Sequence, residues 1–342
     1  MMDNLEQNNS IEYNYVPENL PIEVKRDKFL TKTEIFLSLF SIFILVFLFS
    51  GGQIFSGDNF SKDNEASVAL VEIKKEDFFK DIDIKAKSAY VFDVNSGEIF
   101  FEKNGDSQLP LASLTKTMTA VTALSLVSES TIISVEKTDL VMEGDSGLYA
   151  DEKWRLGDLL NLVLIESSND GAYTVSSSLG EIFVKTGREE GRKYFIKMMN
   201  EKAKDLGLAQ TYFNNESGLD ENDFLAGGYG SARDMAFLIG YAVNQYPNIF
   251  RNTKYDELKI SSLSNLKHNA INTNKTINSI PGVIASKTGY TNLAGGNLVI
   301  VFDAGFGNPI SVVALGSTFE DRFTDVEKLT TATLEYLSKK NN

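Results

Sequence analysis

The sequence predicts an α+β fold built on an antiparallel sheet. Apolar runs at residues 89–94 and 99–102 frame a turn at residues 95–97, which is typical of a hairpin. A second pair of apolar runs, at residues 297–303 and 309–317, surrounds a Gly-rich turn. Helical patterns fill the sequence between these two hairpins. Strands from both ends of the folded region are therefore expected to meet in one sheet.

The helix expected near Ser113 has two distinct sides. Leu114, Met118 and Val121 recur at helical spacing and predict a buried stripe. Ser113 and Lys116 lie one turn apart on another side, among small residues. A lysine that reaches toward solvent beside an N-terminal serine would explain this pair, and so would a catalytic pair. The helix alone leaves both interpretations open.

Four further segments have helical patterns. The segment at 193–206 is amphipathic and stops at Gly207, a residue that often ends helices. The segment at 326–337 places apolar residues at helical spacing near the carboxyl end. The other two expected helices cover residues 154–165 and 231–243.

The first 80 residues are predicted to lie outside the folded domain. Residues 1–34 are polar and aperiodic, which is typical of a disordered arm. Residues 35–55 carry no charge and are long enough to cross a bilayer as a helix. Residues 56–80 are expected to form a stalk, and residues 81–342 the catalytic domain. Four basic residues stand shortly before the apolar run, namely Lys25, Arg26, Lys28 and Lys32.

This charge pattern predicts a single-pass protein of the cell membrane. By the positive-inside rule, the arm stays in the cytoplasm and the domain lies outside the cell. A cleaved signal peptide is the alternative, because Ser50, Gly51 and Gly52 could form a cleavage site. The long segment before the apolar run favours a retained anchor over cleavage.

The composition excludes several function classes. A net charge of −14 argues against nucleic-acid binding, which needs a clustered basic surface. The absence of cysteine excludes disulfides, a thiol nucleophile and thiolate metal sites. His268 is the single histidine, so a Ser-His-Asp triad would depend entirely on it. Because His268 lies in a polar stretch, we interpret it as solvated or structural. A hydrolase built from this chain would use lysine as its base.

Three short motifs occur in order along the chain. They are Ser-Leu-Thr-Lys at 113–116, Ser-Ser-Asn at 167–169 and Lys-Thr-Gly at 287–289. Each carries residue types that acyl transfer needs: a nucleophilic hydroxyl, an amine base and a cation for an anionic substrate group.

Two of these motifs have further copies. Ser-x-x-Lys recurs at 134–137 and 264–267, and Lys-Thr-Gly recurs at 185–187. Lys185 leads into a hydrophilic segment, where a solvated lysine is ordinary. Lys287 stands just before a pair of buried strands, where a lysine lacks a structural explanation. We therefore prefer Lys287 as the functional copy.

The motifs and their surroundings resemble the serine D-alanyl-D-alanine carboxypeptidases, the low-molecular-mass penicillin-binding proteins. LASLTKTMTA, LLNLVLIESSNDGA, FNNESGL and SKTGYTNLAGGNLV are similar to family blocks and follow the family order. The resemblance extends from about residue 86 to the end of the chain. It implies the β-lactamase/DD-peptidase-like fold, an antiparallel sheet flanked by helices plus a helical lobe. The site would lie where sheet and lobe meet.

The resemblance also implies a reaction. The enzyme would remove the terminal D-alanine from peptidoglycan stem pentapeptides through an acyl-enzyme on Ser113, and β-lactams would acylate the same serine. Lys116 would be the base, its pKa lowered by burial and by the nearby cation of Lys287. Ser167 would relay the proton to the leaving amine. Asn169 would hold Lys116 and the substrate backbone.

The third motif would bind the substrate. Lys287 and Thr288 would receive the terminal carboxylate through charge-assisted hydrogen bonds. Gly289 would let the peptide lie along the strand edge, and the N–H groups of Ser113 and Tyr290 would form the oxyanion hole. No metal or organic cofactor is implied, and no nucleic acid.

Other functions share these motifs. A D,D-endopeptidase acting on peptidoglycan cross-links would use the same three. A class A β-lactamase needs a glutamate that activates water, and Glu216, the one glutamate in a comparable place, fits a carboxypeptidase block better. A non-catalytic penicillin sensor would need an intracellular output module, for which residues 1–34 are too short. Glu216 and Ser286 depart from the family pattern and leave substrate preference open.

Overall fold

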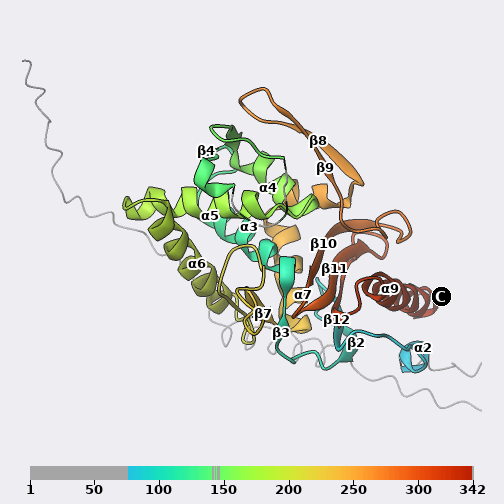
Figure 1. The fold of residues 1–342 in the computed structure, drawn as a ribbon. Coiled ribbons are helices and arrows are strands. Elements are labelled where there is room, and N and C mark those ends of the chain that lie inside the picture. The colour runs from blue at the N-terminus through green and yellow to red at the C-terminus, as the bar shows by residue number, and fades with distance from the viewer. Residues whose placement is uncertain (1–75, 141, 143, 145–146, 341–342) are drawn as a thin grey trace, which may run out of the picture. The chain divides into compact units, whose positions relative to one another are not determined.

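A computed structural model describes residues 76–140, 142, 144 and 147–340. A five-stranded antiparallel sheet with strand order β10-β11-β12-β1-β2 lies at its centre (Figure 1). β1 pairs with β12, with Ser88 opposite Leu315. The predicted sheet, shared by strands from the two ends of the folded region, is therefore confirmed. Its strands are β1 (Ser88–Asp93), β2 (Ile99–Lys103), β10 (Val283–Thr291), β11 (Gly295–Asp303) and β12 (Pro309–Ser317).

Both faces of this sheet are buried, which explains why its strands read as continuous apolar runs. Successive side chains point to opposite faces of a strand. In β1, Ala89 and Val91 face one core cluster, and Tyr90 and Phe92 face the other. β11 and β12 alternate in the same way between the two clusters.

Helices cover the two faces. On one side α9 (Asp321–Lys340) packs on the sheet, and α2 (Glu76–Phe79) lies against α9. On the other side α7 (Ala232–Gln245) contacts β1, β11 and β12. Phe79 is buried in the cluster beneath α9, so the packed domain includes residues that the sequence assigned to the stalk.

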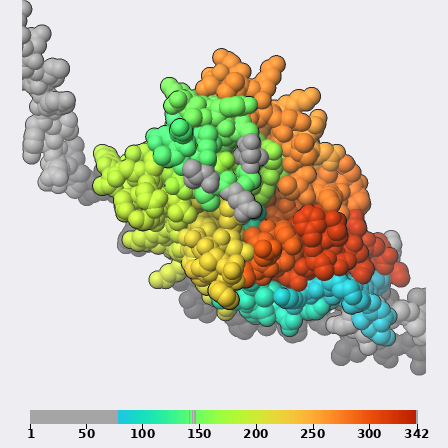
Figure 2. All heavy atoms as spheres, in the orientation of Figure 1, coloured from blue at the N-terminus to red at the C-terminus, as the bar shows by residue number. Residues whose placement is uncertain are grey.

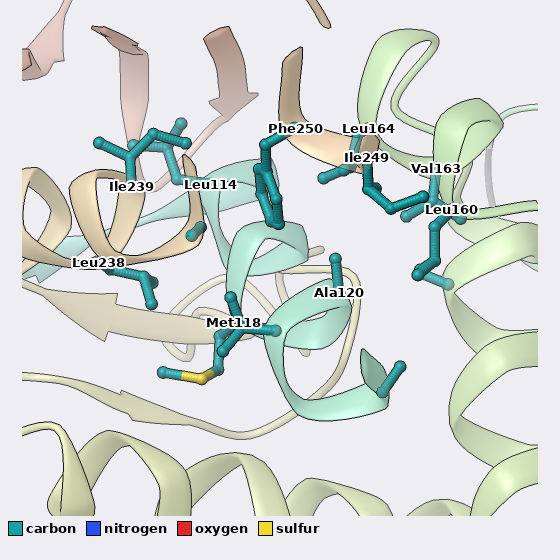
Figure 3. Close-up of a cluster of buried hydrophobic side chains, with 14 of the residues drawn as sticks. Leu114, Met118, Ala120, Leu160, Val163, Leu164, Leu238, Ile239, Ile249 and Phe250 are labelled. Atoms are coloured by element: carbon teal, nitrogen blue, oxygen red, sulfur yellow. The ribbon is translucent and has the colours of Figure 1, made fainter. Parts of the chain in front are cut away.

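A helical lobe is built around α3 (Thr115–Leu126), and η1 (Ala112–Leu114), directly before α3, contacts β10 and β11 of the sheet. The helices around α3 are α4 (Leu156–Ile165), α5 (Asn169–Val184) and α6 (Arg188–Asp205). Every residue of α3 from Thr115 to Ala123 is buried, so the helix is enclosed on all sides rather than only along its predicted stripe. Figure 3 shows apolar side chains of α4 and of the segment at 249–250 close to α3.

Short elements connect these layers. β3 (Leu109–Pro110), β6 (Tyr212–Phe213) and β7 (Gly228–Gly230) form one small sheet, and β8 (Glu257–Ser261) pairs with β9 (Lys267–Ile271) in a hairpin. β4 (Ile132–Ser134) pairs with β5 (Lys153–Arg155). The remaining pieces are η1 (Ala112–Leu114), η2 (Lys137–Asp139), α8 (Pro247–Phe250) and η3 (Arg251–Lys254).

Two predicted helix boundaries are wrong. The sequence places Trp154 inside a helix, but this residue lies fully buried in β5, opposite Ile133, and α4 begins at Leu156. Strand pairing overrides the helical periodicity there. α6 begins at Arg188 rather than at residue 193, and two glutamates in its first turn stabilise the positive end of the helix dipole.

The predicted arm, membrane span and most of the stalk lie outside the described residues. Within the described part of the chain, no helix is both long and apolar enough to cross a membrane.

Candidate active site

Ser113 lies in the tight turn that leads into α3. Ala112, the residue before it, has φ of 48°, an uncommon value for a residue with a side chain. η1 ends at Leu114 and α3 follows directly, so Lys116 lies one turn beyond Ser113. Their side chains meet, with Lys116 Nζ 2.9 Å from Ser113 Oγ. The pair that the sequence left ambiguous is a direct contact.

Lys116 Nζ has three oxygen neighbours. Besides Ser113 Oγ, it donates to Asn169 Oδ1 at 2.7 Å and to the carbonyl oxygen of Ser217 at 2.7 Å. The amide and carbonyl oxygens can only accept, whereas the Ser113 hydroxyl can also donate. A neutral amine has two N–H groups and one lone pair. The arrangement therefore suits a neutral Lys116 that receives the proton of Ser113.

The surroundings of Lys116 favour this neutral form. Its side chain is fully buried, and burial lowers the pKa of Lys116 to about 7. The carboxylate of Glu216 opposes this effect by favouring the charged amine. At neutral pH, a substantial fraction of Lys116 can act as a base.

Ser167 and Asn169 lie at the junction between α4 and α5. Ser167 has φ of 70°, a strained value for a residue other than glycine. Ser168 caps α5 by accepting the Gly171 N–H, which fixes Asn169 in the first turn of that helix. Asn169 contacts Lys116 as expected, whereas the Ser167 hydroxyl accepts a hydrogen bond from Lys287 Nζ at 2.9 Å.

Lys287 lies in β10, the edge strand of the sheet beside η1. Only 2% of its surface is exposed, and Nζ also donates to the Thr288 carbonyl at 3.0 Å. Burial lowers the pKa of Lys287 well below its usual value, and the cations of Lys116 and Arg322 lower it further. Of the two causes expected to lower the pKa of Lys116, burial is confirmed, whereas the repulsion between the two lysines lowers the pKa of Lys287 instead.

Thr288 and Gly289 continue the strand past the nucleophile. The Thr288 hydroxyl lies 2.6 Å from that of Thr273. A Cβ on Gly289 would stand 2.9 Å from the Leu111 carbonyl oxygen and 3.1 Å from Ser113 N. Only glycine lets β10 approach the turn so closely. This approach brings Gly289, the residue before Tyr290, close to the Ser113 backbone N–H.

A cavity of about 450 Å³ extends beside these residues. Asn169 and Tyr290 both line it, together with Asp220. The Tyr290 side chain is half exposed and meets the ring of Phe319 edge-on at 5.0 Å. In Figure 2 atoms of the helical lobe, in green and yellow, adjoin those of β10–β12, in orange and red. The predicted site residues therefore gather where sheet and lobe meet.

The additional copies of the motifs lie outside this site, and their local conformations differ from those of the three site motifs. Lys185 and Thr186 are exposed just after α5, and Lys185 has a left-handed φ of 57°. Ser134 ends β4, and Lys137 is exposed in η2. The remaining copy, at 264–267, spans the turn of the β8–β9 hairpin and is exposed at both ends.

His268 has a structural place in that hairpin. Its Nε2 lies 2.6 Å from Glu152 Oε1, and its ring packs 4.8 Å from the centre of the Trp154 ring. The side chain is 6% exposed. Of the two interpretations offered for this histidine, the structural one is confirmed.

Sequence reasoning missed several residues of the site. Arg322 donates to the Gly289 carbonyl at 2.8 Å and stacks on Phe319, yet an arginine in an amphipathic helix gives no signal of this. Ser217 reaches Lys116 through its backbone, which no side-chain motif reveals. The departure from the family pattern at Glu216 was the one signal for that residue. No cluster of metal-binding side chains occurs among the described residues.

The sequence is similar to those of known proteins. The sequence profile of the Peptidase S11 D-alanyl-D-alanine carboxypeptidases matches residues 72–318. D-alanyl-D-alanine carboxypeptidase DacF of Bacillus subtilis is 31% identical over 251 residues, covering 72% of this chain and 61% of DacF. A D-alanyl-D-alanine endopeptidase of Haemophilus influenzae is 30% identical, covering 68% of this chain and 76% of that protein.

Solved structures agree with the fold. The Streptomyces K15 DD-transpeptidase superposes with a TM-score of 0.67 at 25% identity, covering 74% of this chain and 98% of the transpeptidase. This score supports the α+β fold described above, and the family match covers most of the described residues. The chain belongs to the Peptidase S11 family of D-alanyl-D-alanine carboxypeptidases.

Proposed function

We propose that this protein is a membrane-anchored serine D-alanyl-D-alanine carboxypeptidase that trims peptidoglycan stem pentapeptides. The observation that carries the proposal is the 2.9 Å contact between Ser113 Oγ and a fully buried Lys116 whose pKa is about 7. Names of relatives such as DacF support the substrate class. The chain spans about three fifths of DacF, so the activity is proposed here on its own residues.

In the acylation step, Ser113 Oγ attacks the carbonyl carbon of the penultimate D-alanine while its proton passes to Lys116. The negative charge that develops on the carbonyl oxygen is stabilised by the backbone N–H groups of Ser113 and Tyr290. The close approach of Gly289 to Ser113 N supports this pairing.

The peptide C–N bond then breaks. The proton held by Lys116 passes to the leaving amine through Ser167, and free D-alanine departs. Asn169 keeps Lys116 in place throughout, as its 2.7 Å contact supports. Water then attacks the ester, Ser113 regains its proton, and the shortened peptide is released.

Lys287 and Thr288 select substrates that end in a carboxylate. The buried Lys287 has a lowered pKa in the empty site, and an incoming carboxylate favours its protonated form. Binding is thus coupled to proton uptake by Lys287. β-Lactams place a carboxylate near a reactive carbonyl and acylate Ser113 in the same way.

The uncharged run at residues 35–55 anchors the protein, and the basic residues before it keep residues 1–34 in the cytoplasm. Protease added outside intact cells is expected to remove the domain and to leave a membrane-bound fragment. Recovery of a mature chain starting near Gly52 would instead support cleavage of this segment.

One assay tests the central activity. The purified full chain is incubated with a pentapeptide ending in D-Ala-D-Ala, and free D-alanine is measured over time. Release at a rate that Ser113→Ala abolishes supports the proposal. No release from a folded, penicillin-labelled protein would exclude carboxypeptidase activity on this substrate.

A D,D-endopeptidase is the second candidate, because several relatives of similar identity carry that name. The two activities differ in the group on the leaving side of the scissile bond. An endopeptidase must accept a cross-linked side chain, whereas a carboxypeptidase accepts a free terminal D-alanine. Cross-linked muropeptide dimers offered in parallel with the pentapeptide separate them.

A further inference from the structure

A buried carboxylate near the nucleophile has no place in the reaction described above. Glu216 is fully buried, on the segment that passes beside α3. Its Oε2 accepts from Arg192 Nε at 2.9 Å. Its Oε1 is also buried and has no partner in the described structure beyond the residue's own backbone N–H. Burying an ionisable group in this way is costly and invites a functional explanation.

The segment that carries Glu216 is tied directly to the catalytic helix. Thr119 Oγ1 donates to the Glu216 carbonyl at 2.6 Å, and Lys116 Nζ donates to the Ser217 carbonyl. Thr119 and Lys116 are one turn apart on α3. Gly218 follows with φ of 81°, and a Cβ there would stand 1.9 Å from the Ala112 carbonyl oxygen. The position of Glu216 is thus fixed relative to Ser113 and Lys116.

The titratable groups around Glu216 come from three helices. Arg192 of α6 is its ion-pair partner and lies over the Tyr173 ring of α5 at 5.1 Å. Lys116 of α3 is the other cation that acts on Glu216. Burial raises the pKa of Glu216, and the cations of Arg192 and Lys116 oppose this effect and favour the carboxylate form. Tyr173 also faces this group, and its pKa is raised chiefly by burial. Lys287 is the remaining titratable group that interacts with Lys116.

We propose that Glu216 is a positioning residue for acylation, whose buried negative charge, held by Arg192, controls how readily Lys116 gives up its proton. The proposal rests on the function assigned above to Ser113 and Lys116.

The sign of the effect follows from the charges. Burial favours neutral Lys116, and the carboxylate of Glu216 favours the protonated form. Without that charge, the pKa of Lys116 falls further and its neutral fraction rises at every pH near the transition. The acylation rate falls at low pH because Lys116 becomes protonated there. This acid limb of the pH–rate profile therefore moves to lower pH.

The test measures the acylation rate of the full chain by a fluorescent penicillin between pH 5 and pH 9. In Glu216→Gln, the acid limb is expected to move down by about half a unit to one unit. The rate at pH 5.5, relative to the plateau, then rises about threefold to tenfold. Glu216→Asp keeps the charge and is expected to return the limb toward the wild-type position.

The chain provides a matched control on the same helix. Arg188 of α6 pairs with Asp139, whose side chain is likewise fully buried. Asp139 is not among the groups that shift Lys116. Asp139→Asn is therefore expected to lower the melting temperature and to leave the acid limb in place.

The outcomes are distinct. A folded Glu216→Gln variant with an unmoved or raised limb overturns the inference, and so does an equal movement in Asp139→Asn. If Glu216→Gln does not fold, the double variant Glu216→Gln/Arg192→Gln removes both buried charges and must meet the same criterion. If the wild-type chain does not react with penicillin at all, the proposed function itself fails.

Discussion

The two Lys-Thr-Gly segments of this chain have the same sequence but different structures. Lys185 follows the last turn of α5 in a left-handed conformation, exposed to solvent. Lys287 lies in the middle of a buried edge strand and contacts Ser167. The chemistry of the motif therefore comes from its surroundings, because only burial and close neighbours change the properties of the amine.

The Ser-x-x-Lys segments show the same dependence on surroundings. On α3 the three-residue spacing brings Ser113 Oγ within 2.9 Å of Lys116 Nζ. Across the β8–β9 turn, the same spacing leaves Ser264 accepting a hydrogen bond from the Lys153 backbone. Helical geometry converts the spacing into a contact, and a hairpin does not.

The largest predicted effect distinguishes Ser113 from the serines of the other two Ser-x-x-Lys segments. Ser113→Ala removes the attacking oxygen, so covalent labelling by penicillin should disappear and D-alanine release should fall by about 10⁴-fold or more. Ser134→Ala and Ser264→Ala are the matched controls and should label as the wild type does. Mass spectrometry of the labelled peptide locates the adduct. An adduct on Ser134 or Ser264 would contradict the assignment of the nucleophile.

The next largest effect, on kcat/KM, distinguishes Lys287 from Lys185. If Lys287 binds the substrate carboxylate as proposed, Lys287→Met removes a charge-assisted contact worth about 1.5–3 kcal/mol, or about ten- to a hundredfold in kcat/KM. Most of this loss should be seen as a higher KM. Lys185→Met should change kcat/KM less than about twofold, since a solvated lysine contributes little. Steady-state kinetics on the pentapeptide measure both, and a crippled Lys185→Met enzyme would reverse the comparison.

The glycines of the two segments should differ as well. Gly289→Ala forces a Cβ against the Leu111 carbonyl and Ser113 N, so we expect a loss of about 1–3 kcal/mol in the free energy of unfolding together with slow acylation. Gly187→Ala meets no atom within 4 Å, but its φ of 99° strains any side chain. It should cost about 1–2 kcal/mol of stability and leave the acylation rate per folded molecule unchanged. Denaturant titration and penicillin labelling separate the two effects.

The weakest effect concerns pH. Since Lys116 must be neutral to accept a proton, and its pKa is about 7, the acylation rate should fall as the pH drops below about 7. Burial causes that low pKa, so Lys287→Met should move the acid limb by less than about half a unit. A movement of a full unit would show that the cation of Lys287 sets the pKa of Lys116 after all.

The sheet was predictable because each of its hairpins is formed by neighbouring segments with a recognisable strand–turn–strand pattern. Turn residues at 95–97 and 304–308 separate apolar runs, and the pairing follows from adjacency. The Ser113–Lys116 contact was likewise accessible, since both residues lie within one helical turn. Trp154 shows the limit of local patterns: its strand is created by pairing with β4, about twenty residues earlier.

What could not be predicted depends on contacts between distant segments. The Ser217 carbonyl that holds Lys116 is 101 residues away in sequence, and the interaction uses only its backbone. The sequence-based account of the low pKa of Lys116 named Lys287 beside burial, because two lysines in neighbouring motifs suggest repulsion. The main cause of the low pKa of Lys116 is the complete burial of α3. This burial results from helices that pack around α3, and the motif sequence itself does not indicate it.

The strand order also has a consequence for how the chain is made. β1 lies between β2 and β12, and more than two hundred residues separate its two partners in sequence. During synthesis, one edge of β1 in the early β1–β2 hairpin therefore stays unpaired until β12 has been synthesised. A two-stranded ribbon is marginally stable in water, and an open strand edge invites pairing with other chains. Folding of this domain should consequently be slow and completed late, and a ribosome stalled before Pro309 would release a chain that is prone to aggregation.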